Sequence, residues 1–258
     1  MKTGIVILVC ALAGLGAGVG TGFAGMSAAA VITPMLVTFL GMEPYAAVGI
    51  ALASDVLASA ISAYTYGKNR NLDIRGGAVM MAAVLVFTVV GSYISSLVPS
   101  SAMGNFSVFM TMILGIKFII KPVMTTKDDM KAISKKEKLV KSIVCGAIVG
   151  FICGFVGAGG GMMMLLLLVG VMGYELKTAV GTSVFIMTFT ALTGAVSHFV
   201  IDGAPEWLPL LLCVGFTLLF ARIAAKIANR ADAKTLNRVT GVVLVLLGVV
   251  VLTVSFLS

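Results

Sequence analysis

The sequence has very little charge for its length. Only 11% of the 258 residues are charged, whereas 60% are hydrophobic. A water-soluble domain carries about 25% charged residues, so this chain does not have enough polar side chains to cover a water-facing surface. The short alternating segments that mark transmembrane β-barrels are absent as well. These deficits exclude a soluble globular domain and leave a helical membrane protein.

Side chains that carry enzyme chemistry are also scarce. The chain has a single histidine, and Asp55 is the one acid well inside a predicted span. A metal-binding histidine pair, two close aspartates or a Ser–His pair on facing spans is therefore not available, and we expect no catalytic residues and no cofactor. The cysteines lack metal-ligand spacing and a disulfide framework, so no metal site is expected: Cys10, Cys145, Cys153 and Cys213 all lie in apolar runs.

Long apolar runs are what the sequence has in quantity, and they predict membrane-spanning helices. About 20 apolar residues cross the hydrocarbon layer as a helix. Two further stretches, Ile5–Leu40 and Ser142–Met172, are interrupted near Gly22–Ser27 and Gly157–Gly161. We predict an all-α, multi-pass integral protein of the inner or plasma membrane. The predicted spans are Tyr45–Tyr66, Gly77–Leu97, Asn105–Lys121, Thr178–Val200, Leu208–Ala224 and Val239–Leu257.

The two interrupted stretches belong to an internal repeat with a constant offset of 157 − 25 = 132 residues. Shared membrane composition does not readily produce so many matches at one offset. We therefore predict a first membrane repeat at 1–121, a cytoplasmic basic linker at 122–141 and a second membrane repeat at 142–258. The matched positions include Gly25 with Gly157, Gly41 with Gly173, Glu43 with Glu175, and Ala47-Val48-Gly49 with Ala179-Val180-Gly181.

The second interrupted stretch is too short to cross a membrane twice. From Ser142 to Met172 it has 172 − 142 + 1 = 31 residues, about 46 Å of helix at 1.5 Å per residue. Two full crossings need about 60 Å. We therefore expect each interrupted stretch to be a broken, re-entrant helical hairpin, followed by three transmembrane helices. Because three is odd, the two repeats are expected to be inverted relative to each other.

Basic residues favour the same topology. With re-entrant hairpins, 17 of the 18 Lys and Arg residues face one side and only Lys2 faces the other. By the positive-inside rule, the basic side is cytoplasmic. The net charge of +8 is therefore assigned to membrane orientation, and no nucleic-acid partner is expected. Inverted repeats with broken helices are typical of secondary transporters.

The glycine-rich breaks are the strongest candidates for a binding site. Glycine lets a ligand approach the backbone closely, and a helix that restarts after a break exposes N–H groups that attract anions. The second half carries the run Gly159–Gly161, whereas the first half carries Gly25 and Ser27, whose hydroxyl adds a donor. The alternative is that these glycines only allow tight helix packing.

Three motifs of the second half resemble the TauE/SafE sulfite exporter family. They are Gly154-Phe-Val-Gly157, the run Gly159–Gly161, and Ala179-Val-Gly-Thr-Ser183. The duplicated pattern covers nearly the whole chain. The first half departs from it, since Met26-Ser27-Ala28 replaces further glycines and Ile50-Ala51 replaces Thr-Ser. The resemblance implies transport of sulfite, sulfonates or related sulfur oxyanions, usually outward.

We predict that the two breaks converge near the membrane midplane and bind a small anion. Asp55 is the predicted proton-coupling group, and the alternative is a hydrogen-bonded acid that only stabilises packing. The expected partners are the anion and the lipid bilayer, and a homodimer is left open. A small-ion channel, a proton-coupled uptake carrier for another anion and a structural protein without flux stay open as alternatives. The predicted substrate-binding residues are Gly25, Ser27, Gly157, Gly159, Gly160, Gly161, Thr182 and Ser183.

A few other polar and aromatic residues have simpler interpretations. His198 is favoured as an interfacial packing residue over a proton relay. Glu43 and Glu175 occupy matching turns and are expected to cap or anchor the next helix. Trp207 and Tyr66 are interpreted as membrane-interface anchors.

Overall fold

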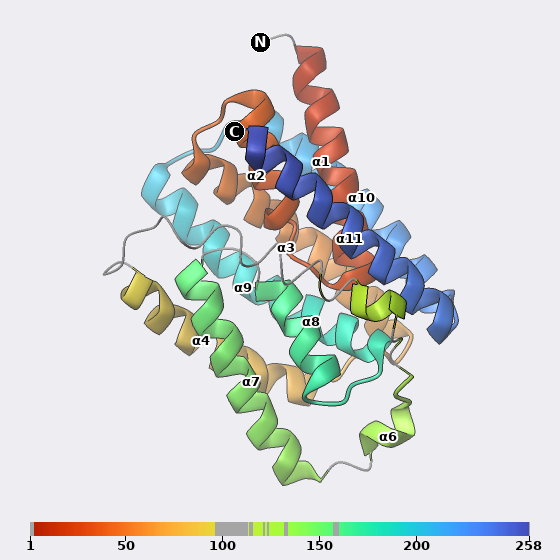
Figure 1. Cartoon of the computed structure of the whole chain (residues 1–258). Coiled ribbons are helices and arrows are strands. Elements are labelled where there is room, and N and C mark those ends of the chain that lie inside the picture. The colour runs from red at the N-terminus through yellow and green to blue at the C-terminus, as the bar shows by residue number, and fades with distance from the viewer. Residues whose placement is uncertain are drawn as a thin grey trace.

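The computed structural model of the chain describes residues 3–95, 113, 116–120, 122, 124–131, 134–156 and 160–257. Every regular element in these residues is a helix (Figure 1), which confirms the predicted all-α class for this part of the chain. The helices are α1 (Thr3–Ala24), α2 (Ala29–Leu40), α3 (Pro44–Lys68), α4 (Ile74–Ser95), α6 (Lys127–Lys131), α7 (Lys135–Val156), α8 (Gly160–Gly170), α9 (Leu176–Asp202), α10 (Trp207–Arg230) and α11 (Ala233–Leu257).

Five of the described helices are long and apolar enough to cross a membrane. They are α1, α3, α9, α10 and the Ala233–Val250 part of α11, whereas the apolar helix α2 and the apolar part of α4, Ile74–Val90, are shorter. The chain is thus a multi-pass membrane protein, as predicted. Most of the predicted span Asn105–Lys121 lies outside the described residues. Helix α1, which forms the first part of the first interrupted stretch, has 22 residues and is long enough to span by itself.

Glycine residues end the short helices by adopting left-handed backbone. Gly41 follows α2 with φ +63°, and its N–H reaches the carbonyls of Leu36 and Val37. Gly173, which follows α8 in the second half, has φ +66°. Only glycine takes this conformation at little cost, so the same turn ends the short helix in both halves.

The helix boundaries themselves follow the 132-residue offset found in the sequence. Helix α9 begins 176 − 44 = 132 residues after α3, and both are preceded by a glutamate at the N-cap position. The repeat is therefore visible in the secondary structure as well as in the sequence.

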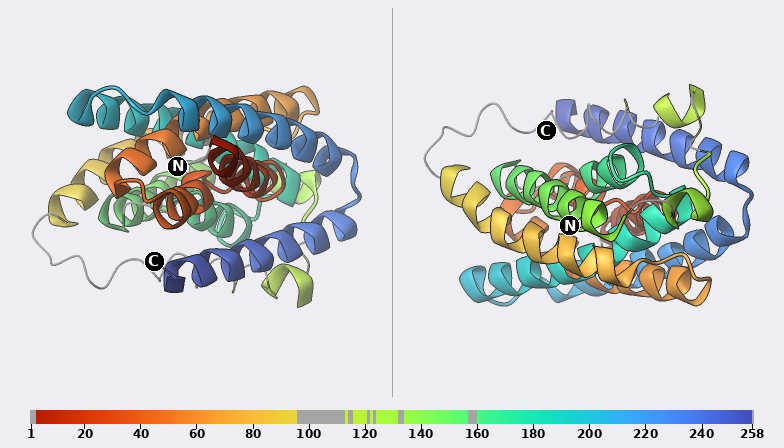
Figure 2. Two further views of the ribbon diagram at one scale, coloured as in Figure 1. Left: turned by 90° about the horizontal axis from the view of Figure 1, so that it is seen from above. Right: turned by 90° about the horizontal axis from the view of Figure 1, so that it is seen from below.

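The two halves pack against each other reciprocally. Helix α1 of the first half packs along α10 of the second, and α7 of the second half packs along α4 of the first. Figure 2 shows the broken pairs α1–α2 and α7–α8 in the middle of the molecule, with α9 and α10 on one side and α11 on the other. In Figure 1, α1 begins at the upper edge of the molecule and α7 begins at the lower edge. The two breaks therefore approach the centre from opposite ends.

A row of glycines lets α1 and α10 approach closely. A Cβ atom built on Gly18 would lie 2.7 Å from the carbonyl oxygen of Thr217 and 2.8 Å from the backbone nitrogen of Ala221. Gly14 and Gly22, one turn before and after, are equally crowded by α10. For these three glycines the packing interpretation is correct, because a small residue at every fourth position forms a flat surface for the neighbouring helix.

Adding one methyl group to this row should destabilise the protein. We expect Gly18→Ala to lower the free energy of unfolding by about 1–3 kcal/mol, as overpacking does, because the contacted atoms belong to the backbone of α10. Gly215→Ala is the control, since a Cβ there meets no atom within 4 Å. It should be neutral or stabilise by up to about 1 kcal/mol through helix propensity. Thermal unfolding of the purified proteins in detergent tests both, and equal melting temperatures would contradict the packing role.

Candidate functional site

The first break, between α1 and α2, is closed by hydroxyl groups from distant helices. The last carbonyls of α1 have no partner within the helix. The Tyr66 hydroxyl of α3 donates to the Gly22 carbonyl at 2.8 Å, and the Thr240 hydroxyl of α11 donates to the Phe23 carbonyl at 3.2 Å. Tyr66 is fully buried, so its interpretation as a membrane-interface anchor is wrong. Its aromatic ring and hydroxyl instead fix the end of α1.

Asp55 faces the same break from α3. It is buried at 1% exposure and accepts hydrogen bonds from the hydroxyls of Ser27 and Ser59, each at 2.7 Å. The Ser27 oxygen also accepts from the backbone N–H of Ala29 at 3.3 Å, the first residue of α2. Ser27 therefore links the start of α2 to the one acid buried in α3.

The start of α8, which follows the second break, lies directly against the first break. The Ser183 hydroxyl of α9 donates to the Gly25 carbonyl at 2.9 Å and lies 3.5 Å from the Gly161 carbonyl. A Cβ on Gly161 would come within 2.8 Å of the Ser27 nitrogen and 2.6 Å of the Met187 sulfur. Four of the predicted site residues, Gly25, Ser27, Gly161 and Ser183, thus lie together.

Of the other predicted glycines, the structure describes only Gly160. Gly160 is the first residue of α8, next to Gly161. Gly157 and Gly159 lie outside the described residues.

A small cavity lies where the first break meets the start of α8. Its volume is about 60 Å³, well below the roughly 300–1,000 Å³ of ligand pockets. Sequence reasoning had not identified Leu52, Met164, Met187, Thr190 and Ala191 as neighbours of the site. The lining residues are Ser27, Leu52, Asp55, Gly161, Met164, Met187, Thr190 and Ala191.

The repeat explains why one wall of the cavity is polar and the other apolar. Asp55 corresponds to Met187 (187 − 55 = 132), and Ser59, which binds Asp55, corresponds to Ala191 (191 − 59 = 132). No lysine or arginine lines the cavity. An anion here would therefore be held by backbone N–H groups and hydroxyls, with Asp55 as the titratable group beside it.

Thr182 lies one position before Ser183 but belongs to a different cluster. Its hydroxyl oxygen accepts a hydrogen bond from the Asp73 backbone N–H at 3.2 Å, and it does not line the cavity. Successive helix residues point about 100° apart, so one side chain reaches the break and the other reaches the α3–α4 loop. The structure thus separates Thr182 from the other predicted site residues.

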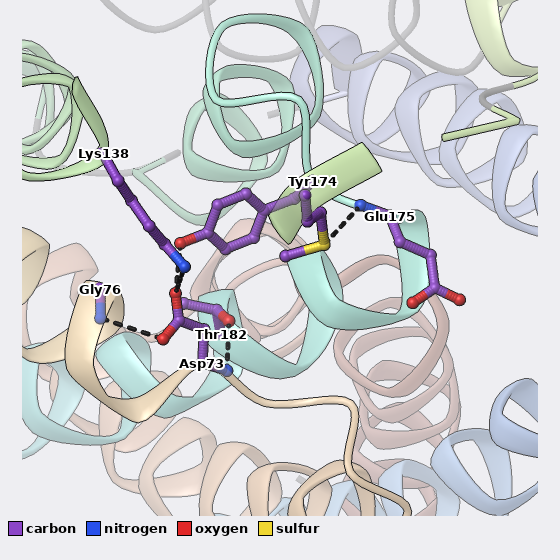
Figure 3. Close-up of polar contacts among 7 residues, drawn as sticks. Asp73, Gly76, Lys138, Tyr174, Glu175 and Thr182 are labelled. Atoms are coloured by element: carbon purple, nitrogen blue, oxygen red, sulfur yellow. Dashed lines mark hydrogen bonds and ion pairs between the residues drawn. The ribbon is translucent and has the colours of Figure 1, made fainter. Parts of the chain in front are cut away.

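The Asp73 carboxylate is the centre of this second cluster (Figure 3). Lys138 at the start of α7 forms an ion pair with it at 2.6 Å, and the Tyr174 hydroxyl from the α8–α9 turn donates to the same oxygen at 2.5 Å. The Gly76 N–H donates to the other oxygen at 3.1 Å. Three segments of the fold therefore meet at one carboxylate, hereafter the Asp73 cluster. This cluster could not be predicted from the sequence, because Asp73 and Tyr174 are 101 residues apart.

The surroundings of Asp73 keep it ionised. Burial raises the pKa of its carboxyl, but the hydrogen bonds from Lys138, Tyr174 and Gly76 lower it by more, so the pKa lies below its ordinary value. Burial and the adjacent Asp73 carboxylate raise the pKa of the Tyr174 hydroxyl. Tyr174 therefore stays protonated and acts as a donor.

A second set of polar contacts joins other basic segments to the α3–α4 loop, which also carries Asp73. The Asn71 side-chain amide donates to the Asn229 side chain at 2.7 Å, and the Lys127 ammonium donates to the Asn71 side-chain oxygen at 2.6 Å. Lys177 reaches the Asn229 carbonyl at 3.1 Å. Basic segments from both halves therefore lie at one end of the molecule, as the charge partition predicted.

The remaining polar residues have structural roles. The Glu43 carboxylate accepts from the Ala46 N–H at 2.9 Å, which confirms its helix-capping role. Glu175 occupies the N-cap position of α9 and accepts from the Thr178 hydroxyl at 3.1 Å. His198 stacks on Tyr45 with ring centroids 4.0 Å apart, in keeping with a packing role.

Comparison with known proteins gives consistent matches over most of the chain. The family model described as sulfite exporter TauE/SafE matches residues 10–251. The probable membrane transporter protein YunE of Bacillus subtilis is 27% identical, over 94% of this chain and 95% of its own. Probable membrane transporter proteins of Methanocaldococcus jannaschii and Haemophilus influenzae are each 24% identical over 80% of this chain, covering 78% and 79% of their own lengths. No solved structure matches the chain.

Removing the charge of Asp73 should destabilise the fold in a pH-dependent way. We expect Asp73→Asn to cost about 2 kcal/mol near neutral pH, the usual range for hydrogen bonds to a charged group. Because folding lowers the pKa of Asp73, its stabilisation is complete above the unfolded value of about 4 and is lost as pH falls through the lower folded value. The difference between wild type and Asp73→Asn should therefore shrink in acid.

Thermal unfolding in detergent across a pH series measures this difference. Glu137→Gln is a matched control, since Glu137 forms an exposed ion pair with Lys141 one turn away on α7. Exposed pairs of this kind contribute about 0.3–0.5 kcal/mol. A pH-independent difference for Asp73→Asn would show that the carboxylate charge does not stabilise the cluster.

Proposed function

The chain belongs to the sulfite exporter TauE/SafE family and is a membrane transporter, and we propose that it exports a small sulfur oxyanion or organosulfonate across the inner or plasma membrane. The observation that carries the proposal is the contact of the first break with α9 and with the start of α8, where Ser183 bonds to Gly25 and Gly161 abuts Ser27. In transporters built from repeats, broken helices of the two halves form the substrate site.

The two halves are proposed to be inverted repeats, each with a re-entrant hairpin. Three observations support this: the start of α9 132 residues after that of α3, each after a glutamate at the N-cap position, the reciprocal packing of α1 with α10 and α7 with α4, and the opposite starting ends of α1 and α7 (Figure 1). Halves related by a pseudo-two-fold axis in the membrane plane suit alternating access. The Asp73 cluster would then hold the basic, cytoplasmic end closed in this conformation.

Anion binding would change the hydrogen bonds of the polar wall. At present the Ser27 hydroxyl donates to Asp55. An ionised Asp55 beside a bound anion would repel it strongly in a medium of low dielectric constant. A protonated Asp55 instead carries an O–H that can itself donate, and Ser27 becomes free to turn its hydroxyl to the anion. We therefore assign Asp55 the proton-coupling role, with proton and anion bound together.

Flux into proteoliposomes tests the function. We expect saturable flux of at least one of sulfite, taurine and sulfoacetate, with sulfate and acetate as comparison anions. Gly161→Ala should abolish that flux at wild-type protein levels, because its methyl group would push Ser27 and Met187 away from α8. Gly215→Ala, whose methyl group meets nothing within 4 Å, should transport normally. Linear, non-saturating flux would favour a small-ion channel, and normal flux in Gly161→Ala would refute the site.

Asp55→Asn tests the coupling role separately. Asparagine keeps an acceptor for Ser27 or Ser59 and should fold normally, but it cannot exchange a proton. We expect its transport rate to lose the pH dependence of the wild type. Glu43→Gln, which alters an exposed helix-capping acid, should keep the wild-type profile. If the rate and pH profile of Asp55→Asn match those of the wild type, Asp55 has only a structural role.

A further inference from the structure

We propose that Arg75, Lys138 and Ser142 form a second oxyanion site at the basic end of the molecule, separate from the central cavity. The site lies in a cavity between the start of α4 and the start of α7. The volume of this cavity is about 340 Å³, within the roughly 300–1,000 Å³ typical of ligand pockets. Its walls also include Asp73, Gly76 and Val79.

The wall of this cavity includes a serine whose hydroxyl has no partner among the described residues. Ser142 is 1% exposed and lines the cavity, yet its hydroxyl has no hydrogen-bond partner within the part of the chain that the structure describes. Buried hydroxyls are nearly always hydrogen-bonded, so an exception needs an explanation. A bound acceptor, such as the oxygen of an anion, would provide the missing partner.

The charges around Ser142 favour an anion over a neutral acceptor. Arg75 has no ion-pair partner among the described residues, and its guanidinium offers a planar pair of donors that suits oxyanions. The Lys138 ammonium has three donors and uses one on Asp73. Asp73 is the only acid in the lining, and Lys138, Tyr174 and Gly76 already bind both of its oxygens. The lining therefore has a net charge of 2 − 1 = +1.

The position of this site connects it to the central cavity through α9. Asp73 bonds to Thr182, and the next residue, Ser183, bonds to Gly25 at the first break. An anion bound to Lys138 would compete with Asp73 for the ammonium and weaken the Asp73 cluster (Figure 3), which joins α4, α7 and the α8–α9 turn. In transport, this site would be the point where the anion binds before it reaches the central cavity. That entry role rests on the proposed transport function, whereas anion binding at the site does not.

Two sources share the required chemistry, a free sulfur oxyanion and the phosphate of an anionic phospholipid. Inorganic sulfate is the probe for the first, titrated into the purified full chain in phosphatidylcholine nanodiscs. Gly161→Ala protein serves as the background, so that binding at the central cavity does not contribute. Phosphatidylglycerol retained by the wild-type chain in native mass spectrometry is the probe for the second, and this arm does not depend on how the Gly161→Ala protein folds.

Two variants and one control are compared in both arms. Arg75→Gln should weaken binding about tenfold and Ser142→Ala about fivefold, from the usual contributions of charged and neutral hydrogen bonds. Neither side chain has a protein partner among the described residues, so both variants should fold normally. Arg230→Gln removes an exposed arginine at the end of α10 and should bind like its parent.

Each outcome decides the proposal. Sulfate binding that both variants weaken supports a site for a free oxyanion, and phosphatidylglycerol retention that both variants weaken supports a lipid phosphate at the same site. If neither probe binds, or if Arg75→Gln and Ser142→Ala bind like Arg230→Gln, the site does not exist. Absence of flux for every anion tested would refute the transport proposal but would leave these binding results unchanged.

Discussion

The whole centre of this protein depends on satisfying backbone polar groups where no water reaches them. A helix that stops inside a membrane leaves carbonyls and N–H groups unpaired, and each costs several kcal/mol in hydrocarbon. Here the end of α1 is possible because three hydroxyls arrive from elsewhere: Tyr66 binds Gly22, Thr240 binds Phe23 and Ser183 binds Gly25. The helices α3, α9 and α11 are thereby fixed around the first break, and the break in turn fixes where a ligand can approach.

Close packing is the second requirement, because a hydroxyl on a short side chain reaches a neighbouring backbone only when the helices nearly touch. Gly14, Gly18 and Gly22 bring α10 against α1, and Gly161 brings α8 against Ser27. The same residue type thus has two effects in one chain. In the helix interior it allows two helices to pack along each other, and at the start of α8 it allows close contact with the first break.

Much of this could be predicted from the sequence, because membrane composition and a constant repeat offset reveal helices and their order. The convergence of Gly25, Ser27, Gly161 and Ser183 follows from the logic of repeats that approach from opposite ends. The repeat pattern could not predict the direction in which an individual side chain points. Thr182 differs from Ser183 by one helix position and binds the α3–α4 loop instead. Tyr66 is aromatic and near a helix end, which is the pattern of an interface anchor, yet its hydroxyl is needed inside. The Asp73 cluster joins segments that only the tertiary fold brings together.

The two repeats have diverged, so polar and charged side chains are distributed unequally between the two ends of the molecule. This difference affects how a transporter can open at both ends. At the basic end Asp73, Lys138 and Tyr174 form a charged cluster. The equivalent positions at the other end, each 132 residues away, are Pro205, Val6 and Met42.

A carrier needs its two closed states to differ by only a few kcal/mol, since otherwise one state traps the protein. A partly exposed ion pair contributes modestly because water competes for its charges, so it can be matched by apolar contacts at the opposite end. An arriving anion that binds Lys138 shifts that balance directly, whereas apolar contacts offer an anion nothing to bind. Under the proposed export function, this chemical asymmetry of the two ends would favour loading from the basic side.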